Sequence, residues 1–391
     1  MHECNDDKIP LRPIALDPLP HLPLVSVLLT NYNYAPYLGE AIESILTQTY
    51  QNFELVICDD GSTDCSREIL KRYQSRDFRI KAVYQENGGQ SLGLTAAFHK
   101  STGEIICFLD ADDVFLPDKL RMVVKAFAAA PESGFAVNRM LLVDKARKYL
   151  GAIPSLYDLP SGWQGESLNV NGPRILPGLP PTSGLSLRRS VAEVIFPLPA
   201  GLKIYSDALI QVVAPLATPI AAVQTPLSEY RVHGDNLAGV SRFTESRLRN
   251  IVSYQGEIWT AWRRYLASPH SGLPPNFPLP SEIAPTFMHY AYARFRSDKN
   301  SRAIYRAIPH SYLQALPRPH QLYWQASTIL PGWLFRRSFD FVYGQASVKM
   351  LARRIVNILR RRGDEICSNT GPGWSERRIR HIGGETRVAE P

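Results

Sequence analysis

The stretch Glu104–Asp113, EIICFLDADD, decides the fold. After Glu104, the five residues Ile105 to Leu109 are apolar, with several β-branched or aromatic side chains, and residues 104–109 predict a buried strand. Three carboxylates, Asp110, Asp112 and Asp113, then fall within four positions. Crowded anions repel one another unless a cation or hydrogen-bond donors lie between them, and Mg²⁺ or Mn²⁺ is the natural oxygen-liganded ion. The alternative is a turn in which Asp112 caps the helix that Pro117 and the following apolar residues predict.

Upstream of this stretch, strands alternate with helices. The spacing predicts strands at 24–29, 53–58, 80–84 and 104–109, separated by helices around 38–46, 69–73 and 92–100. Such alternation within about a hundred residues indicates parallel βαβ units, whose ligands bind beyond the carboxyl ends of the strands. Polar clusters follow three of the strands, at 30–34, 59–64 and 110–113. We therefore expect one crevice formed by three strand ends.

Composition and charge set further bounds. The 391 residues are 45% hydrophobic and 20% charged, as in an ordinary globular protein with room for a second unit. The net charge is +8, and residues 331–391 carry 12 Lys and Arg against 6 Asp and Glu. Five scattered cysteines suit a reducing compartment. Neither a signal peptide nor an apolar run of about 20 residues is evident, so we expect a cytoplasmic protein, either soluble or peripheral on the inner face of the membrane.

Changes in amino-acid composition along the chain predict four segments. Five prolines in residues 1–23 indicate an extended leader, and the catalytic domain would span 24–240. A helical region rich in aromatics and Arg follows at 241–370, and 371–391 has the composition of a disordered tail. Within the catalytic domain, the Pro- and Gly-rich residues 151–184 predict a long loop over the crevice.

Four motifs carry a resemblance to a known family. VSVLLTNYNY at 25–34, VICDDGSTD at 56–64, FLDADD at 108–113 and YRVHGDN at 230–236 resemble, in order and spacing, the family 2 glycosyltransferases of the GT-A fold. The resemblance covers residues 24–237. It implies an α/β fold with a GT-A-like, mostly parallel sheet flanked by helices, followed here by a mainly helical C-terminal region.

The resemblance also implies roles in binding a nucleotide-sugar donor. Thr30, Tyr32 and Asn33 would lie beside the base, and Asp59 and Asp60 would hold uracil and ribose. The alternative for Asp60-Gly61-Ser62 is a turn and helix cap.

For the acidic motif, the resemblance implies that Asp110 faces the ribose, whereas Asp112 and Asp113 bind Mg²⁺ or Mn²⁺. The ion would stabilise the charge that grows on the departing diphosphate.

The acceptor hydroxyl needs a general base, which the resemblance places at Asp207. Ser206 stands where the family usually has Glu, and the alternative is that Asp207 only caps its helix. In the last motif, the resemblance implies that His233 reaches the metal or the diphosphate and that Arg231 neutralises phosphate. The alternative for His233 is a structural role.

These roles together predict an inverting, metal-dependent glycosyltransferase. It would move a sugar from a nucleotide-diphosphate sugar, UDP-linked, to a glycan or lipid-linked acceptor in bacterial surface polysaccharide synthesis. The rival is a catalytically silent nucleotide-sugar-binding or scaffold protein of the same fold. A nucleotidyltransferase or a dinucleotide oxidoreductase would need a Gly-rich loop after the first strand, where this chain has TNYNYAP.

The basic C-terminal region predicts a further partner. Residues 330–362 interleave aromatic and aliphatic side chains with Arg, a pattern that suits an anionic membrane surface. The alternative is a helix that packs its apolar face on the catalytic domain. No recognised nucleic-acid-binding module is present, so we do not expect nucleic acid as a partner.

Overall fold

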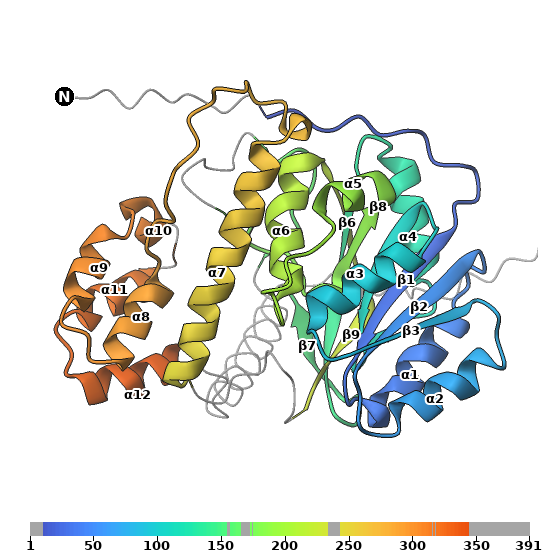
Figure 1. The fold of residues 1–391 in the computed structure, drawn as a ribbon, viewed down its shortest axis with the longest axis horizontal. Helices are drawn as coiled ribbons and strands as arrows, with labels where there is room; N and C mark the ends of the chain where they lie inside the picture. Colours follow the sequence, from blue (N-terminus) through green and yellow to red (C-terminus); the bar gives the residue numbers. More distant parts are fainter. Residues whose placement is uncertain are drawn as a thin grey trace, which may run out of the picture.

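The computed structural model describes residues 11–154, 157–165, 173, 175–233, 243–314, 316 and 318–343. In this part of the chain, nine strands form one mixed sheet with helices packed against it, and a separate group of helices lies beyond α7 (Figure 1). The strand order is β3-β2-β1-β4-β8-β6-β9-β5, and β7 pairs with β6. The predicted fold class, an α/β sheet flanked by helices and followed by a mainly helical C-terminal region, is confirmed. The sheet is mixed and not mostly parallel, because four of the eight strand pairs in the described residues are antiparallel.

The first half of the sheet is parallel, as its alternating sequence predicts. Its strands are β1 (Val25–Asn31), β2 (Phe53–Asp60), β3 (Ile80–Gln85) and β4 (Ile105–Asp110). The crossover helices are α1 (Ala35–Leu46), α2 (Ser66–Gln74) and α3 (Gln90–Lys100). Thr30 of β1 lies in register between Cys58 of β2 and Asp110 of β4, so the polar strand ends come to one edge.

The second half mixes strand directions. Its strands are β5 (Val114–Phe115), β6 (Phe135–Asp144), β7 (Tyr149–Ile153), β8 (Leu185–Arg188) and β9 (Ile220–Val232). Its helical segments are α4 (Lys119–Ala129), η1 (Thr182–Gly184), α5 (Arg189–Ile195) and α6 (Ser206–Ala217). The segment predicted as one long loop, 151–184, therefore includes the end of β7 and all of η1, which is a correction.

The long strands β6 and β9 escaped the sequence analysis. Proline normally argues against a central strand because it lacks an N–H donor, and Pro226 lies inside β9. The structure accommodates it with register shifts on either side of Arg139, the residue opposite Pro226. Such irregularities let a strand continue past a residue that cannot join the ladder.

Two hydrophobic clusters cover the two faces of the sheet. Alternate residues of β1 divide between them: Leu28 packs in one, and Val27 and Leu29 pack in the other. The extended leader is attached to the first cluster, since Leu11 is buried there and the Ile14 N–H donates to the Ala217 carbonyl at 2.8 Å.

The C-terminal region is helical. Its elements are α7 (Glu245–Leu266), η2 (Pro269–Ser271), α8 (Phe287–Phe295), α9 (Ser301–Ala307), α10 (His310–Gln314), α11 (Arg318–Ser327) and α12 (Gly332–Tyr343). Helix α7 joins two cores: Trp259 and Trp262 pack in the first of the two clusters on the sheet, whereas Leu248 belongs to an aromatic cluster with α8, α11 and α12. The part built on the sheet and the C-terminal helices therefore share one element.

Helix α12 shows part of the predicted amphipathic region. Phe335 and Phe339 are fully buried in the aromatic cluster, so this part packs its apolar face against other helices of the same chain. Trp333 and Phe341 remain 65% and 60% exposed. The basic segment beyond Tyr343 and the predicted tail lie outside the described residues. In the described part of the chain, no helix combines the length and the apolar character needed to span a membrane.

We predict that Thr286→Ala lowers the free energy of unfolding by about 1 kcal/mol, because it removes the N-cap of α8. The Thr286 hydroxyl accepts from the Met288 N–H at 3.2 Å, and the imidazole of His289 returns a contact to the Thr286 N–H. Urea denaturation measures the change. Thr260→Ala in the exposed middle of α7 is the matched control and should be neutral or slightly stabilising, since alanine favours helix. Equal losses in the two variants would contradict the capping role.

Candidate active site

A cavity of about 360 Å³ opens at the carboxyl ends of β1 and β4, beside the N-termini of α3 and α6. Of the residues predicted to act, six line it: Thr30, Tyr32, Asp60, Asp110, Asp112 and Asp207. Its remaining lining residues are Asn31, Tyr34, Asn87, Gly89, Gln90, Ala111, Pro181, Thr182, Lys203, Ile204, Tyr205 and Tyr230. The six predicted residues come from four distant parts of the sequence and meet in this cavity.

The acids of this cavity crowd together. Burial and the like charges of Asp112 and Asp207 raise the pKa of Asp110 to about 8. The Tyr230 phenol reports the same crowding, because burial raises its pKa and the carboxylates of Asp113, Asp110, Asp112 and Asp207 raise it further. The negative charges of four carboxylates therefore converge near the Tyr230 hydroxyl. Such crowding favours binding of a cation or of a ligand rich in hydrogen-bond donors.

Asp112 has a buried neighbour behind it. The His233 Nε2 lies 2.9 Å from Asp112 Oδ2, and the imidazole stacks on the Tyr37 ring with centroids 4.6 Å apart. The structure therefore brings these two predicted metal residues together. His233 itself does not line the cavity, and Gly234–Asn236 of its motif lie outside the described residues.

Arg231 is engaged inside the protein. Its guanidinium forms an ion pair with Glu40 and donates to the Asp112 carbonyl at 2.9 Å, and its side chain is 4% exposed. It also lies over the Tyr37 ring. Arg231 does not line the cavity. The structure therefore places the predicted phosphate-binding residue on the side of residues 110–113, the acidic turn, that faces away from the cavity.

Asp113 likewise faces inward. One carboxylate oxygen accepts from the Ser183 hydroxyl at 2.6 Å, and the other accepts from the Arg231 N–H at 3.0 Å. The side chain does not line the cavity. Its pKa lies well above the ordinary value because of burial, followed by the charges of Asp112 and Asp110. In this arrangement Asp113 fastens the acidic turn to η1 and β9.

Two residues of η1 support the acids, and the sequence analysis missed both. The Thr182 hydroxyl bonds to Asp110, and its backbone also contacts Asp207. Ser183 bonds to Asp113 and accepts from the Asp110 N–H at 3.1 Å. The only signal was a Thr-Ser pair after two prolines in a segment predicted to be loop. Nothing in its spacing indicated contact with residues some 70 positions earlier.

The loops after β1 and β2 hold each other in place. The Asn33 carboxamide oxygen accepts from the Thr63 N–H at 2.7 Å, and Asn33 adopts a left-handed backbone with φ of 59°. Asp59 is fully buried, and one of its oxygens accepts from the Ser62 N–H at 3.0 Å. Neither Asn33 nor Asp59 lines the cavity. Among the predicted base-binding residues, Tyr32 is 41% exposed and offers its ring to a ligand.

Asp60 organises the turn before α3. Its carboxylate accepts from the Gly88 N–H at 2.8 Å, the Gly89 N–H at 2.7 Å and the Gln85 carboxamide at 2.7 Å. Gly89 has a φ of 90°, and a Cβ there would meet the Lys203 Cα at 2.6 Å. Only glycine suits both conditions. These contacts come from the segment before α3, so they differ from the local turn and cap at Asp60-Gly61-Ser62 that the alternative predicts.

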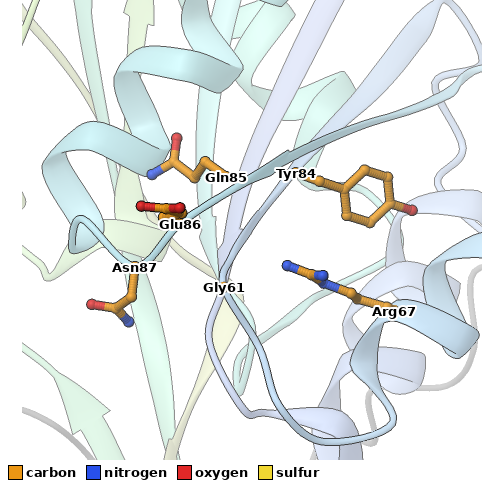
Figure 2. Close-up of a pocket in the computed structure, with 6 residues that line it drawn as sticks. All are labelled: Gly61, Arg67, Tyr84, Gln85, Glu86 and Asn87. Atoms are coloured by element: carbon orange, nitrogen blue, oxygen red, sulfur yellow. The ribbon is translucent and has the colours of Figure 1, made fainter.

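An open hollow adjoins the cavity on the side of β3 and shares Asn87 with it (Figure 2). In Figure 2 the Arg67 guanidinium lies beside the Tyr84 ring, whereas Gln85, Glu86 and Asn87 follow along the chain. The Arg67 Cζ is 5.8 Å from the Tyr84 ring centroid, and Tyr84 is 42% exposed.

Asp207 lies in the first turn of α6. The residue before the helix is Tyr205, whose φ of 65° is left-handed, and one Asp207 oxygen accepts from the Ala208 N–H at 2.9 Å. Asp207 therefore contacts the helix end, as the capping alternative states, and also lines the cavity, as a base must. Burial raises its pKa, which strengthens it as a proton acceptor once it is ionised.

The donor set fits a hard divalent ion only in part. Asp110 and Asp112 present carboxylates to the cavity, and oxygen ligands are what Mg²⁺ and Mn²⁺ prefer. In the described residues, no group of three His, Cys, Asp or Glu side chains is placed to hold a metal ion. The chain could therefore supply one or two ligands, with the others coming from substrate phosphates and water, as is usual for Mg²⁺.

Comparisons with known proteins identify the domain. The family model described as glycosyl transferase family 2 matches residues 26–191. An uncharacterised glycosyltransferase of Nostoc sp. is 35% identical over 227 residues, 54% of this chain and 66% of that protein. A putative teichuronic acid biosynthesis glycosyltransferase of Bacillus subtilis is 40% identical over 99 residues, 25% of this chain and 39% of that protein.

The structure of residues 1–349 of TarS from S. aureus in complex with UDP aligns with a TM-score of 0.48 and 20% identity, covering 77% of this chain and 87% of that one. The chain spans about two thirds of the Nostoc relative and well under half of the Bacillus one. Through residues 26–191, the chain belongs to glycosyl transferase family 2.

Proposed function

We propose that the protein is an inverting glycosyltransferase that uses a nucleotide-diphosphate sugar, UDP-linked, as donor. The observation that carries the proposal is the convergence of Asp110, Asp112 and Asp207 on one cavity at the carboxyl ends of β1 and β4. Family membership supports the same reaction.

The donor would extend along the strand ends. Tyr32 is 41% exposed and would offer its ring to the base, and Asp110 lines the same cavity, where the ribose and diphosphate would follow. Asn33, Asp59 and Asp60 would act by fixing the loops around the nucleotide, since their carboxylate or carboxamide oxygens accept from backbone N–H groups. The hollow of Figure 2 gives the nucleotide end room beyond Asn87.

A bound Mg²⁺ or Mn²⁺ would supply Lewis-acid stabilisation of the charge on the departing diphosphate. Asp112 would hold it directly, with Asp110 beside it. His233 would orient Asp112 from behind, and Asp113 with Arg231 would fix the turn that presents it. This division refines the predicted metal set of Asp112, Asp113 and His233, because Asp113 and His233 do not line the cavity.

Asp207 would accept the proton of the acceptor hydroxyl. Its place in the first turn of α6 puts the carboxylate near the positive end of the helix dipole, while burial limits its hydration. One base and one displacement would invert the configuration at the sugar's C1. No second carboxylate needs to form a covalent intermediate.

The acceptor would be a growing glycan or a lipid-linked sugar in bacterial surface polysaccharide synthesis. The printed name of the Bacillus relative, teichuronic acid biosynthesis glycosyltransferase, supports the polysaccharide class. A cytoplasmic, membrane-peripheral enzyme would suit such an acceptor. Trp333, Arg337 and Phe341, which recur every four residues on the exposed side of α12, form a suitable face toward anionic lipid.

A panel of nucleotide sugars tests the proposal. With the full chain and Mn²⁺, we expect one UDP-sugar to release free UDP at a rate that an added acceptor increases. A protein that binds UDP with Mn²⁺ but releases none from any donor would be the silent, sugar-nucleotide-binding alternative. A protein that binds neither UDP nor GDP in the presence of metal would contradict both readings.

A further inference from the structure

The side chain of Gln90 spans the gap between the acidic turn and the helix that carries Asp207. Its amide Nε2 donates to Asp110 Oδ1 at 3.0 Å, and its Oε1 accepts from the Ser206 N–H at 3.3 Å. Gln90 is the first residue of α3, and it lines the cavity. One carboxamide therefore touches both halves of the candidate site, 20 residues from one partner and 116 from the other.

The contact supports the start of helix α6, because the residue in the N-cap position offers no side-chain acceptor. The first N–H groups of a helix have no partner within it, and a Ser, Thr, Asp or Asn side chain usually supplies one. The residue in the N-cap position is Tyr205, which makes no capping bond and adopts a left-handed backbone. The Gln90 carboxamide takes that place from another element, so the start of α6 is fixed by α3.

Neighbouring contacts keep the two segments in register. The Gln90 N–H donates to the Lys203 carbonyl at 2.8 Å, and the buried hydroxyls of Ser91 and Ser206 are 2.8 Å apart. On the side of this segment away from α3, the Tyr205 ring packs edge-on against the Tyr254 ring of α7, with the ring centroids 5.7 Å apart. The segment before Asp207 is thus held between α3 and α7. A displacement of Gln90 would therefore change the position of Asp207.

We propose that Gln90 is a positioning residue that sets Asp207 relative to Asp110, and so aligns the acceptor's base with the bound donor. The inference rests on the proposed function of the site. Gln90 acts through its two partners: its amide orients Asp110 toward the donor, and its carbonyl fixes the first turn of α6. Loss of the first contact should weaken donor use, whereas loss of the second should slow the transfer step.

Two substitutions separate these contacts. Gln90→Met keeps the length of the side chain and removes both hydrogen bonds. Gln90→Glu keeps an acceptor for the Ser206 N–H and replaces the donor that faces Asp110. Gln325→Met is the matched control, because it makes the same exchange at an exposed position of α11 that does not line the cavity.

We expect Gln90→Met to lower kcat about 30- to 100-fold and to raise the donor KM several-fold, as a misplaced catalytic group does. Gln90→Glu should recover most of the kcat loss and keep the KM defect. Calorimetry with UDP and Mn²⁺ should show weaker UDP binding in both Gln90 variants. Gln325→Met should stay within about threefold of wild type in both constants. Circular dichroism melts confirm that each variant is folded.

The split between kcat and KM decides the outcome, since a purely structural residue would change the folded fraction and leave the constants of the active enzyme alone. The proposal is overturned if Gln90→Met matches wild type in both constants, or if Gln90→Glu loses as much kcat as Gln90→Met. Should Gln90→Met not fold, Gln90→Glu still decides, because wild-type values would refute the contact with Asp110. A wild-type protein without turnover would refute the proposed function itself.

Discussion

Asp207→Asn should reduce turnover of the donor about 10³-fold, within the range that loss of a general base produces. Asparagine has nearly the same shape and can still accept from the Ala208 N–H, but it cannot take a proton from the acceptor. Because the substitution leaves Asp110 and Asp112 in place, UDP affinity in the presence of Mn²⁺ should stay within about threefold. Release of UDP and calorimetric titration measure the two effects.

The matched control is Asp118→Asn. Asp118 precedes α4 as the N-cap position, it bonds to Thr49 and Arg121, and its side chain is 46% exposed. If acidic residues at helix starts matter here only for the helix, both variants should lose a little stability and keep turnover. Turnover near the wild-type rate in Asp207→Asn would show that the base lies elsewhere and would favour the silent alternative.

The sequence was sufficient to predict those site residues that come directly after a strand. Three motifs, each next to an apolar run, predicted which strand ends would meet, and the parallel register of β1 with β2 and β4 brings them to one edge. That inference needed only local pattern, because parallel strands share the direction of their carboxyl ends. Five of the predicted residues line the cavity for this reason: Thr30, Tyr32, Asp60, Asp110 and Asp112.

The sequence could not say which carboxylates face the ligand. Asp112 and Asp113 are adjacent, yet Asp112 lines the cavity and Asp113 turns inward to Ser183 and the Arg231 N–H. Their difference depends on partners that lie 70 and 118 residues away. Asp60 shows the same limit, since the backbone of Gly88 and Gly89 occupies its oxygens.

The supporting residues were hidden for a related reason. Gln90, Thr182 and Ser183 are ordinary polar residues in segments without a functional pattern, and their roles arise only when η1 and α3 pack beside α6 and the acidic turn. Hydrogen bonds between distant side chains leave no periodicity in the chain. A single sequence therefore reveals the residues that touch the ligand sooner than those that hold them in place.

Asp112→Asn should abolish the effect of metal on donor binding. We expect Mn²⁺ to strengthen UDP binding by the wild-type protein, and EDTA to reverse this, because an ion between Asp112 and a diphosphate offsets the repulsion between them. In Asp112→Asn, an amide replaces the carboxylate that lines the cavity, so UDP affinity with Mn²⁺ should fall about 10²-fold, a loss of about 2.7 kcal/mol. Turnover should fall at least as far.

A substitution of His233 tests the same metal site in a second way. Its imidazole is 2.9 Å from Asp112 Oδ2 and stacks on Tyr37, so His233→Gln should remove the buried support of the carboxylate but leave the carboxylate itself. Loss of such an orienting partner typically weakens metal binding about 10- to 100-fold. The Mn²⁺ concentration for half-maximal UDP binding should therefore rise in His233→Gln, whereas in Asp112→Asn added Mn²⁺ should not restore binding. If Mn²⁺ strengthened UDP binding equally in wild type and Asp112→Asn, the ion would have to be held by other groups, and the assignment of Asp112 would fail.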